Sequence, residues 1–228
     1  YGAGAVQTLM NVYGVLPGKR VLMVGAGNIG LIVSYQLLQA GVDVVAVVEA
    51  MPKVGGYWVH AAKIRRLGVP IYLQHSIKEA YGKDVIEGAL IQEVDHTCSG
   101  IGNEKRIDCD IICMAVGLSP TTELCWQAGC AMQYVPQLCG YVPKRDRTMR
   151  TTNRDLWIAG DASGIEEASA AMVEGRIAGL NAAASLGLPV RAEGMAEYWQ
   201  RLDHLRAGEV GEKIRAGIGQ VLVDSWED

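Results

Sequence analysis

The feature that most restricts the fold of this sequence is a glycine-rich turn between two apolar segments. The turn consists of Gly25, Ala26, Gly27, Asn28, Ile29 and Gly30. The run 21–24 before it predicts a strand, and the run 31–38 after it predicts a helix. Glycines at these spacings permit a tight turn, a close approach of phosphate oxygens to bare backbone, and packing of the helix on the strand.

An acidic residue follows the turn at an informative distance. Glu49 lies 19 positions after Gly30, at the end of the apolar run 42–48. A carboxylate there can accept hydrogen bonds from ribose hydroxyls and would repel a 2′-phosphate. These features predict a Rossmann-type unit that prefers NAD to NADP. Lys53 and Arg65 nearby leave NADP open, and a glycine-rich strand-to-helix turn can also be purely structural.

The remaining patterns predict an α/β fold, a Rossmann-type parallel sheet with an antiparallel β-meander. Helices are expected at 5–12, 57–67, 166–186 and in a short segment after Pro120, and strands at 69–73, 111–116 and 156–159. The β-like runs 84–96 and 104–108, separated by the polar stretch 99–105, predict the hairpin or meander. In the tail, Met195, Tyr198, Trp199, Leu202 and Leu205 have helical spacing, which predicts an apolar face buried on this chain or on a partner subunit.

Composition excludes several classes of function. The net charge is −4 with both signs interspersed, so we expect no nucleic-acid partner and no anionic membrane surface. No apolar run approaches the roughly 20 residues of a membrane span, and no leader pattern opens the chain, so a cytoplasmic location is expected. The six cysteines form no C-x-x-C pair, which predicts buried reduced thiols and no metal site.

Three passages resemble the pyridine nucleotide-disulfide oxidoreductase superfamily of flavoproteins. They are the glycine turn with Glu49, the run 111–120 and the run 151–164. The resemblance implies that Ala115, Gly117 and Pro120 mark the return from a nicotinamide domain to a flavin domain. It also implies that Gly160 and Asp161 form the second flavin fingerprint, with Asp161 facing a ribityl hydroxyl. An ordinary helix N-cap is the alternative role for Asp161.

The resemblance also implies a domain organisation. We expect a leading helix at 1–16, an NAD-binding domain at 17–117, the C-terminal part of an FAD-binding domain at 118–190 and a helical tail at 191–228. The superfamily's first FAD fingerprint would precede residue 25, so we expect the FAD-domain segment that carries it to lie outside this sequence. Within the superfamily, residues 2–10 and 164–170 most resemble the large subunits of heteromeric sarcosine oxidase, opine oxidase, proline dehydrogenase and hydrogen cyanide synthase.

These observations predict the nucleotide-binding portion of an FAD-dependent oxidoreductase that transfers hydride between NAD(H) and flavin. The resemblance further implies that the complex oxidises a small-molecule amine or amino acid and that a flavoprotein partner subunit takes part. The alternative is a non-catalytic subunit or module that binds NAD or another adenine nucleotide. One smaller question stays open here: whether Trp58 covers an adenine or packs into the core. Cys125 and Cys130 lie on the wrong side of the nicotinamide domain for the superfamily's redox pair and have no histidine nearby in sequence, so we expect no redox role for them.

Overall fold

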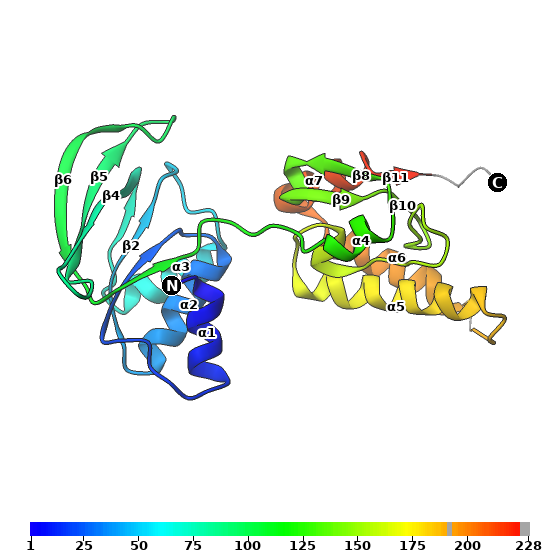
Figure 1. Ribbon diagram of the computed structural model, residues 1–228, viewed down its shortest axis with the longest axis horizontal. Helices are drawn as coiled ribbons and strands as arrows, with labels where there is room; N and C mark the ends of the chain where they lie inside the picture. Colours follow the sequence, from blue (N-terminus) through cyan, green and yellow to red (C-terminus); the bar gives the residue numbers. More distant parts are fainter. Residues whose placement is uncertain (191–192, 224–228) are drawn as a thin grey trace. The chain divides into compact units, whose positions relative to one another are not determined.

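The computed structural model describes residues 1–190 and 193–223, and the chain forms two compact units (Figure 1). The first unit is Tyr1–Val116 and the second is Gly117–Asp228. Each unit has its own hydrophobic clusters, so each is described by itself. The units meet in sequence just before Gly117, whose φ of +150° is a backbone conformation that favours glycine.

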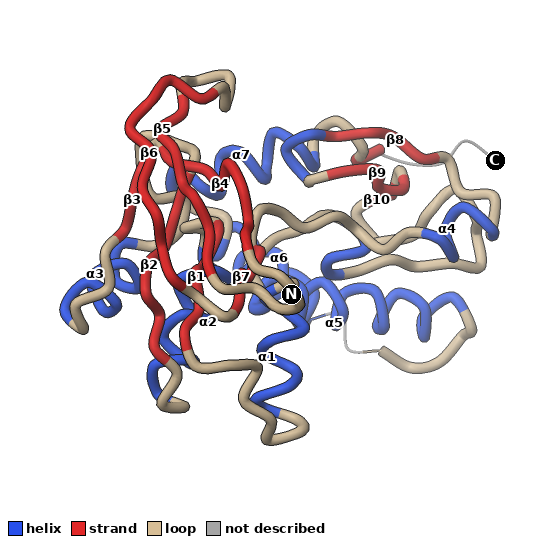
Figure 2. Tube along the Cα trace, turned by 60° about the vertical axis from the view of Figure 1, so that its left-hand side comes forward, coloured by secondary structure: helices blue, strands red, loops and turns tan. Residues whose placement is uncertain are grey.

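A four-stranded parallel sheet forms the centre of the first unit (Figure 2). Its order is β3-β2-β1-β7, and the strands are β1 (Arg20–Val24), β2 (Asp43–Glu49), β3 (Ile71–Leu73) and β7 (Ile111–Met114). The central strands are almost entirely apolar because side chains on both faces are buried. The predicted Rossmann-type parallel sheet is therefore confirmed.

Helices cover one face of this sheet. They are α1 (Ala3–Asn11), α2 (Asn28–Gln39) and α3 (Trp58–Arg66). Val21 and Met23 of β1 join the cluster to which all three helices contribute, whereas Leu22 and Val24 belong to a second cluster. This division follows from the alternation of side chains along a strand.

An antiparallel sheet packs on the face of the parallel sheet opposite the helices, and it confirms the predicted meander. It has the order β4-β5-β6, with β4 (His75–Tyr81), β5 (Gly88–Val94) and β6 (Gly100–Asp108). Ala89 and Ile91 of β5 share a cluster with Leu22 of the parallel sheet. The expected boundaries were wrong: β4 precedes the run 84–96, and the polar stretch 99–105 lies mostly within β6. Strand β6 is an exposed edge, so its pairing with β5 does not require apolar side chains.

The second unit combines helices with short paired strands. A hairpin joins β8 (Met132–Val135) to β9 (Gly140–Pro143), and β10 (Arg145–Asp146) pairs with β11 (Leu222–Val223). The helices are α4 (Glu123–Gln127), α5 (Ala168–Ser185), α6 (Glu193–Leu205) and α7 (Gly208–Ile218), and the 3-10 turns are η1 (Pro136–Leu138) and η2 (Gly160–Ser163).

The strand expected at 156–159 does not form. Within the described residues, this segment makes one isolated bridge, between Arg150 and Trp157. Hydrogen bonds from Thr151 N–H to Leu156 O (2.9 Å) and from Ile158 N–H to Met149 O (2.9 Å) fold it back on the preceding residues. The apolar pattern arises because Trp157 and Ala159 pack against α5 and α6, whereas Leu156 and Ile158 pack with Cys125 and Cys130.

The apolar face of the tail packs on this chain. Leu202 of α6 is fully buried in a cluster with Val173 and Ile177 of α5, and Tyr198 and Trp199 pack against the same cluster. Leu205 remains 39% exposed, so it lies at the margin of this contact. The first two and last five residues of the predicted tail, 191–192 and 224–228, lie outside the described residues. Among the helices described, none has the length and apolar character that crossing a membrane requires.

We expect Leu202→Ala to lower the free energy of unfolding by about 2–5 kcal/mol, because it leaves a cavity between α5 and α6. Leu205→Ala is the matched control: the same change on the same helix, at an exposed position, should alter stability by less than about 1 kcal/mol. Urea denaturation followed by circular dichroism measures both values. Equal effects of the two substitutions would contradict the observed packing of α6.

Candidate nucleotide-binding site

Two glycines of the turn between β1 and α2 are required by the packing of the first unit. Gly25 has a φ of +104°, and a Cβ atom there would lie 2.3 Å from the carbonyl oxygen of Ala115. A Cβ atom at Gly30 would lie 2.1 Å from the carbonyl oxygen of Gly25. Both contacts are far shorter than any real Cβ contact, so neither position accepts a side chain without a shift of backbone.

Gly27 is different, although it belongs to the same motif. Its φ of −73° and ψ of 176° are extended backbone that any residue adopts. A Cβ atom at Gly27 would meet nothing within 4 Å. The fold of this chain therefore does not require glycine at this position, and the open space beside it lies at the N-terminus of α2.

The start of α2 is suited to an anion. The helix has 12 residues, Gly27 is its N-cap, and Asn28 and Ile29 begin its first turn. No acidic side chain lies in that turn, so no carboxylate of the helix itself occupies the positive end of the dipole. Backbone N–H groups at such an end bind phosphate oxygens readily.

Glu49 stands at the carboxyl end of β2 and contacts the turn directly. Its Oε2 accepts a hydrogen bond from the N–H of Ala26 (2.8 Å), and its Oε1 accepts one from the N–H of Met51 (3.0 Å). An ionised carboxylate has about four acceptor sites, so these two bonds leave capacity for further donors. The structure thus brings Glu49 together with the glycine turn.

The segment after β2 folds across the turn, which the sequence did not reveal. Gly56 N–H donates to the Ala26 carbonyl (2.9 Å), and Tyr57 N–H donates to Asn28 Oδ1 (2.8 Å). A Cβ atom at Gly56 would lie 2.8 Å from the backbone nitrogen of Asn28, so this close approach needs glycine. The available signal was the pair Gly55-Gly56, which begins six positions after Glu49 at the end of β2. Trp58 is 76% exposed, which excludes the interpretation that it packs into the core.

A cavity of about 300 Å³ lies between α3 and the edge strand β3. Its lining is apolar except for the exposed Arg65, and it is formed by Val54, Trp58, Ala61, Ala62, Arg65, Ile71 and Leu73. None of the glycine-turn residues contributes to this lining. Leu73 is the strand neighbour of Glu49, so the cavity lies one strand away from the acidic residue.

Ala115 has a structural role in the same place. Its N–H donates to the Val24 carbonyl (2.7 Å), and its own carbonyl closes on Gly25. Ala115 therefore packs against the glycine turn and leaves no space for a side chain at Gly25. Gly117 is exposed, and a Cβ atom there would have open space, so only its positive φ favours glycine.

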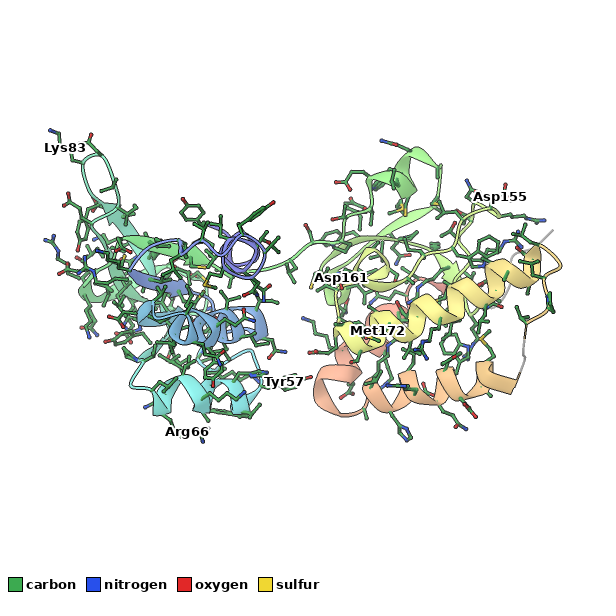
Figure 3. The ribbon with its side chains drawn as sticks, turned by 90° about the horizontal axis from the view of Figure 1, so that it is seen from below. Tyr57, Arg66, Lys83, Asp155, Asp161 and Met172 are labelled. Carbon is green, nitrogen blue, oxygen red and sulfur yellow. The ribbon has the colours of Figure 1, made fainter. Side chains whose placement is uncertain are left out.

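In the second unit, Gly160 and Asp161 form the beginning of η2, close to the N-terminal part of α5 (Figure 3). Gly160 is buried with a φ of +71°, and a Cβ atom there would lie 3.2 Å from the Cβ of Ala171. Asp161 is exposed. The N-cap of α5 is Glu167, so Asp161 does not cap that helix.

A buried carboxylate lies under this turn. The N–H of Gly160 donates to Oε2 of Glu174 on α5 (2.9 Å). The sequence contained a signal for it: Glu174 falls on the same helical stripe as the buried residues Ala170, Val173 and Ile177. A charged residue in a buried stripe needs a partner inside the protein.

The cysteines form no paired or metal-binding group in the described residues. Cys98 and Cys139 are exposed, which corrects the expectation that all six thiols are buried. Cys125 and Cys130 do share one hydrophobic cluster. Burial raises the pKa of Cys125, and the neighbouring Cys130 adds to this effect, so the thiol form is favoured.

Comparison with known proteins identifies relatives of this architecture. The sequence model of the family described as "Pyridine nucleotide-disulphide oxidoreductase" matches residues 4–175. An opine oxidase subunit of Agrobacterium tumefaciens (strain Ach5) is 29% identical over 196 residues, which cover 82% of this chain and 39% of that protein. The corresponding opine oxidase subunit of Rhizobium meliloti (strain 1021) is 30% identical over 213 residues, which cover 82% of this chain and 44% of that protein.

Among solved structures, the thioredoxin reductase of T. acidophilum has a similar fold, with a TM-score of 0.64 at 24% identity. The match covers 73% of this chain and 52% of that chain. The chain spans about two-fifths of the length of the opine oxidase subunits it matches.

Gly30→Ala tests whether the packing of the turn requires glycine. In an open helix, Gly→Ala stabilises by about 1 kcal/mol, and Gly175→Ala on α5, where a Cβ atom would meet nothing within 4 Å, should do so. Gly30→Ala should instead lower the free energy of unfolding by at least about 2 kcal/mol. Gly27→Ala should change it by less than about 1 kcal/mol. Thermal and urea unfolding measure all three, and a stabilising Gly30→Ala would contradict the geometry.

Proposed function

Because the chain belongs to the pyridine nucleotide-disulphide oxidoreductase family, we propose that it is the nucleotide-binding portion of an FAD-dependent oxidoreductase that transfers hydride between NAD(H) and flavin. The family is one of oxidoreductases that use FAD and NAD(P). The nicotinamide and the flavin supply the hydride chemistry when they are bound. The residues of this chain bind and orient these groups, and the proposal assigns no side chain as nucleophile or general base.

The observation that carries the proposal is the contrast among the three glycines of the turn. The protein itself needs glycine at Gly25 and Gly30, where neighbouring carbonyl groups leave no room for a side chain. It does not need glycine at Gly27, where a side chain would have open space. A ligand that approaches the backbone at the start of α2 supplies the missing reason, and a pyrophosphate is such a ligand.

Glu49 supports a preference for NAD. Its carboxylate is held at the turn by the N–H groups of Ala26 and Met51 and keeps acceptor sites for ribose hydroxyls. The same negative charge opposes a 2′-phosphate at that place. Lys53 and Arg65, the cations that could favour a 2′-phosphate, are both exposed to solvent, which weakens their influence.

In the second unit, we assign the turn that contains Gly160 and Asp161 to the flavin. Asp161 is exposed at the first position after a buried glycine with positive φ, and its side chain is available as an acceptor for a ligand hydroxyl. The order of the two turns in the sequence, and the run 111–120 between them, match the family resemblance. The domain at 17–117 would then bind NAD and the segment 118–190 would contribute to the flavin domain.

We further propose that the chain is part of a subunit of an amine- or amino-acid-oxidising complex. The support is the similarity to two proteins that are named as subunits of opine oxidases. A flavoprotein partner and the remaining FAD-domain segment would complete the assembly. An adenine-nucleotide-binding module without catalysis is the competing function, and the following measurement separates the two.

Calorimetric titration should show that the chain binds NADH more tightly than NADPH by about tenfold or more, because Glu49 opposes the 2′-phosphate. Glu49→Gln removes the charge and should lower the ratio of the NADPH dissociation constant to the NADH dissociation constant. Glu79→Gln, the same change at an exposed position of β4 in the same unit, should leave it unchanged. Gly27→Ala should weaken NADH binding by about tenfold or more without loss of structure.

The outcomes separate the candidate functions. Binding of neither nucleotide would exclude the cofactor assignment. NADH binding, together with a flavin absorbance band and NADH oxidation by an artificial acceptor in the complete native protein, would support the oxidoreductase. NADH binding by a colourless and inert complete protein would support the binding module.

Asp161→Ala should weaken FAD binding to the complete native protein by about tenfold, because a hydrogen bond to a charged acceptor is lost. Asp155→Ala is the matched control, since Asp155 is also exposed in the second unit but lies away from Asp161 (Figure 3). Flavin content and titration of the flavin-free protein with FAD measure the effect. Equal FAD affinity of the two variants would refute the role of Asp161.

A further inference from the structure

Glu174 of α5 is a fully buried carboxylate whose two oxygens have different tasks. Oε1 accepts hydrogen bonds from Nη2 of Arg145 (3.0 Å) and Nη2 of Arg206 (2.6 Å). Oε2 accepts hydrogen bonds from the N–H of Gly160 (2.9 Å) and from Oγ of Ser163 (2.9 Å). Glu174 therefore joins two guanidinium groups on one side to the η2 turn on the other.

The charges around Glu174 are balanced. Arg206 also binds Glu166 through Nε (3.0 Å to Oε2) and through Nη2 to Oε1. The side chains of Arg145 and Glu174 are each 1% exposed, and those of Arg206 and Glu166 are 7% and 9% exposed. Two cations and two anions thus form a network that is almost closed to water.

Stability alone does not explain this arrangement. Buried ion pairs can often be replaced by well-packed apolar residues without loss of stability, because removing the charges from water is unfavourable. The neighbours of Glu174 on its stripe, Val173 and Ile177, show that the position is compatible with an apolar core. An apolar side chain, however, could not accept the hydrogen bond from Gly160.

The two groups that Glu174 binds lie on either side of Asp161. Gly160 is the residue before it, and Ser163 follows two positions later at the end of η2. Holding both fixes the backbone that carries the exposed Asp161. Oγ of Ser163 also lies 2.9 Å from the Gly160 carbonyl, so its one proton is shared between two acceptors within the same turn.

We propose that Glu174 is the positioning residue of the flavin site: it holds the η2 turn in the conformation that presents Asp161 to FAD, and Arg145 and Arg206 hold Glu174. The proposal rests on the proposed function, in which this turn binds FAD. The ligand of the positioned turn is the sugar-like ribityl chain with its adjoining pyrophosphate.

The electrostatics favour an ionised Glu174. Burial raises the pKa of this carboxyl group, but Arg145 and Arg206 together with the donors from Gly160 and Ser163 outweigh it, and the pKa lies below its ordinary value. As an ionised group, Glu174 accepts all of its hydrogen bonds and donates none. This matches its surroundings, because every partner is a donor.

The network also ties the C-terminal helices to the turn. Arg206 follows α6, and its carbonyl oxygen accepts a hydrogen bond from Nη1 of Arg215 on α7. The same Arg206 reaches Glu174 through its guanidinium group. The segment 193–218 therefore belongs to the support of the η2 turn, although it lies far from Asp161 in sequence.

Glu174→Gln tests the proposal because an amide has only one acceptor oxygen. If that oxygen faces the two arginines, the amide N–H₂ meets the donor of Gly160; in the opposite orientation it meets the guanidinium groups. In the complete native protein, the dissociation constant for FAD should rise by about tenfold or more. The visible circular dichroism of bound flavin should change as well. Glu123→Gln, at an exposed position of α4, is the matched control and should alter neither.

Ser163→Ala is the second variant, since it removes one donor to Oε2 and leaves all four charges in place. It should fold as the wild type does and raise the FAD dissociation constant by about threefold. If Glu174→Gln does not fold, this variant decides: an unchanged FAD affinity in Ser163→Ala overturns the proposal.

The remaining outcomes are also decisive. If Glu174→Gln melts at a lower temperature but binds FAD with unchanged affinity and an unchanged flavin spectrum, Glu174 is only structural and the proposal fails, while the flavin assignment of Asp161 stands. If the wild-type protein binds no FAD, the proposed function fails and this inference fails with it. NADH titration of each variant shows whether the first unit is intact.

Discussion

Contacts between backbone and backbone organise the first unit. The carbonyl oxygens of Ala115 and Gly25 occupy the places where side chains at positions 25 and 30 would stand. This lets the start of α2 lie directly against β1 and the end of β7. Since Gly25 N–H also bonds to the Val48 carbonyl (2.7 Å), the turn is fixed to β2, whose last residue is Glu49. The positive end of a helix and an acidic strand end are thereby brought together as a result of close packing.

The second unit solves a similar problem by other means. In the described residues its sheets have only two strands each, so no extended parallel sheet is present to fix the position of a turn at its edge. The η2 turn is held instead by a buried side chain, Glu174, through one main-chain and one hydroxyl donor. A buried carboxylate needs compensation, and Arg145 and Arg206 provide it from a strand and from the end of a helix. The position of the turn therefore depends on residues that are distant in sequence.

How far the sequence could predict the structure depended on the range of each interaction. The turn from Gly25 to Gly30 and the place of Glu49 follow from spacing within one βαβ unit, and the parallel sheet with its meander follows from periodicity. Gly56 was missed because its reason is a contact with Asn28 that only the folded loop creates. Glu174 was missed because its partners come from three separate segments. The strand expected at 156–159 was wrong because an apolar pattern reports only burial. Here Trp157 and Ala159 pack against α5 and α6, and Ile158 packs with Cys125 and Cys130, without a neighbouring strand.

The candidate site contains two kinds of residue: those that the packing of the fold requires, and those that belong to a motif but that the packing does not require. Gly30 and Glu174 act through the backbone that they shape, so a change at either would affect a ligand only through the protein. Gly27 and Asp161 are different, because the fold leaves open space at one and exposes the other. Residues that belong to a motif without being needed by the packing are those whose chemistry is best explained by a ligand. Glu49 acts in both ways, because one of its oxygens holds Ala26 while the carboxylate keeps acceptor capacity for a ligand. The loop that we propose to bind the pyrophosphate and the group that we propose to select the nucleotide are therefore joined by a direct hydrogen bond.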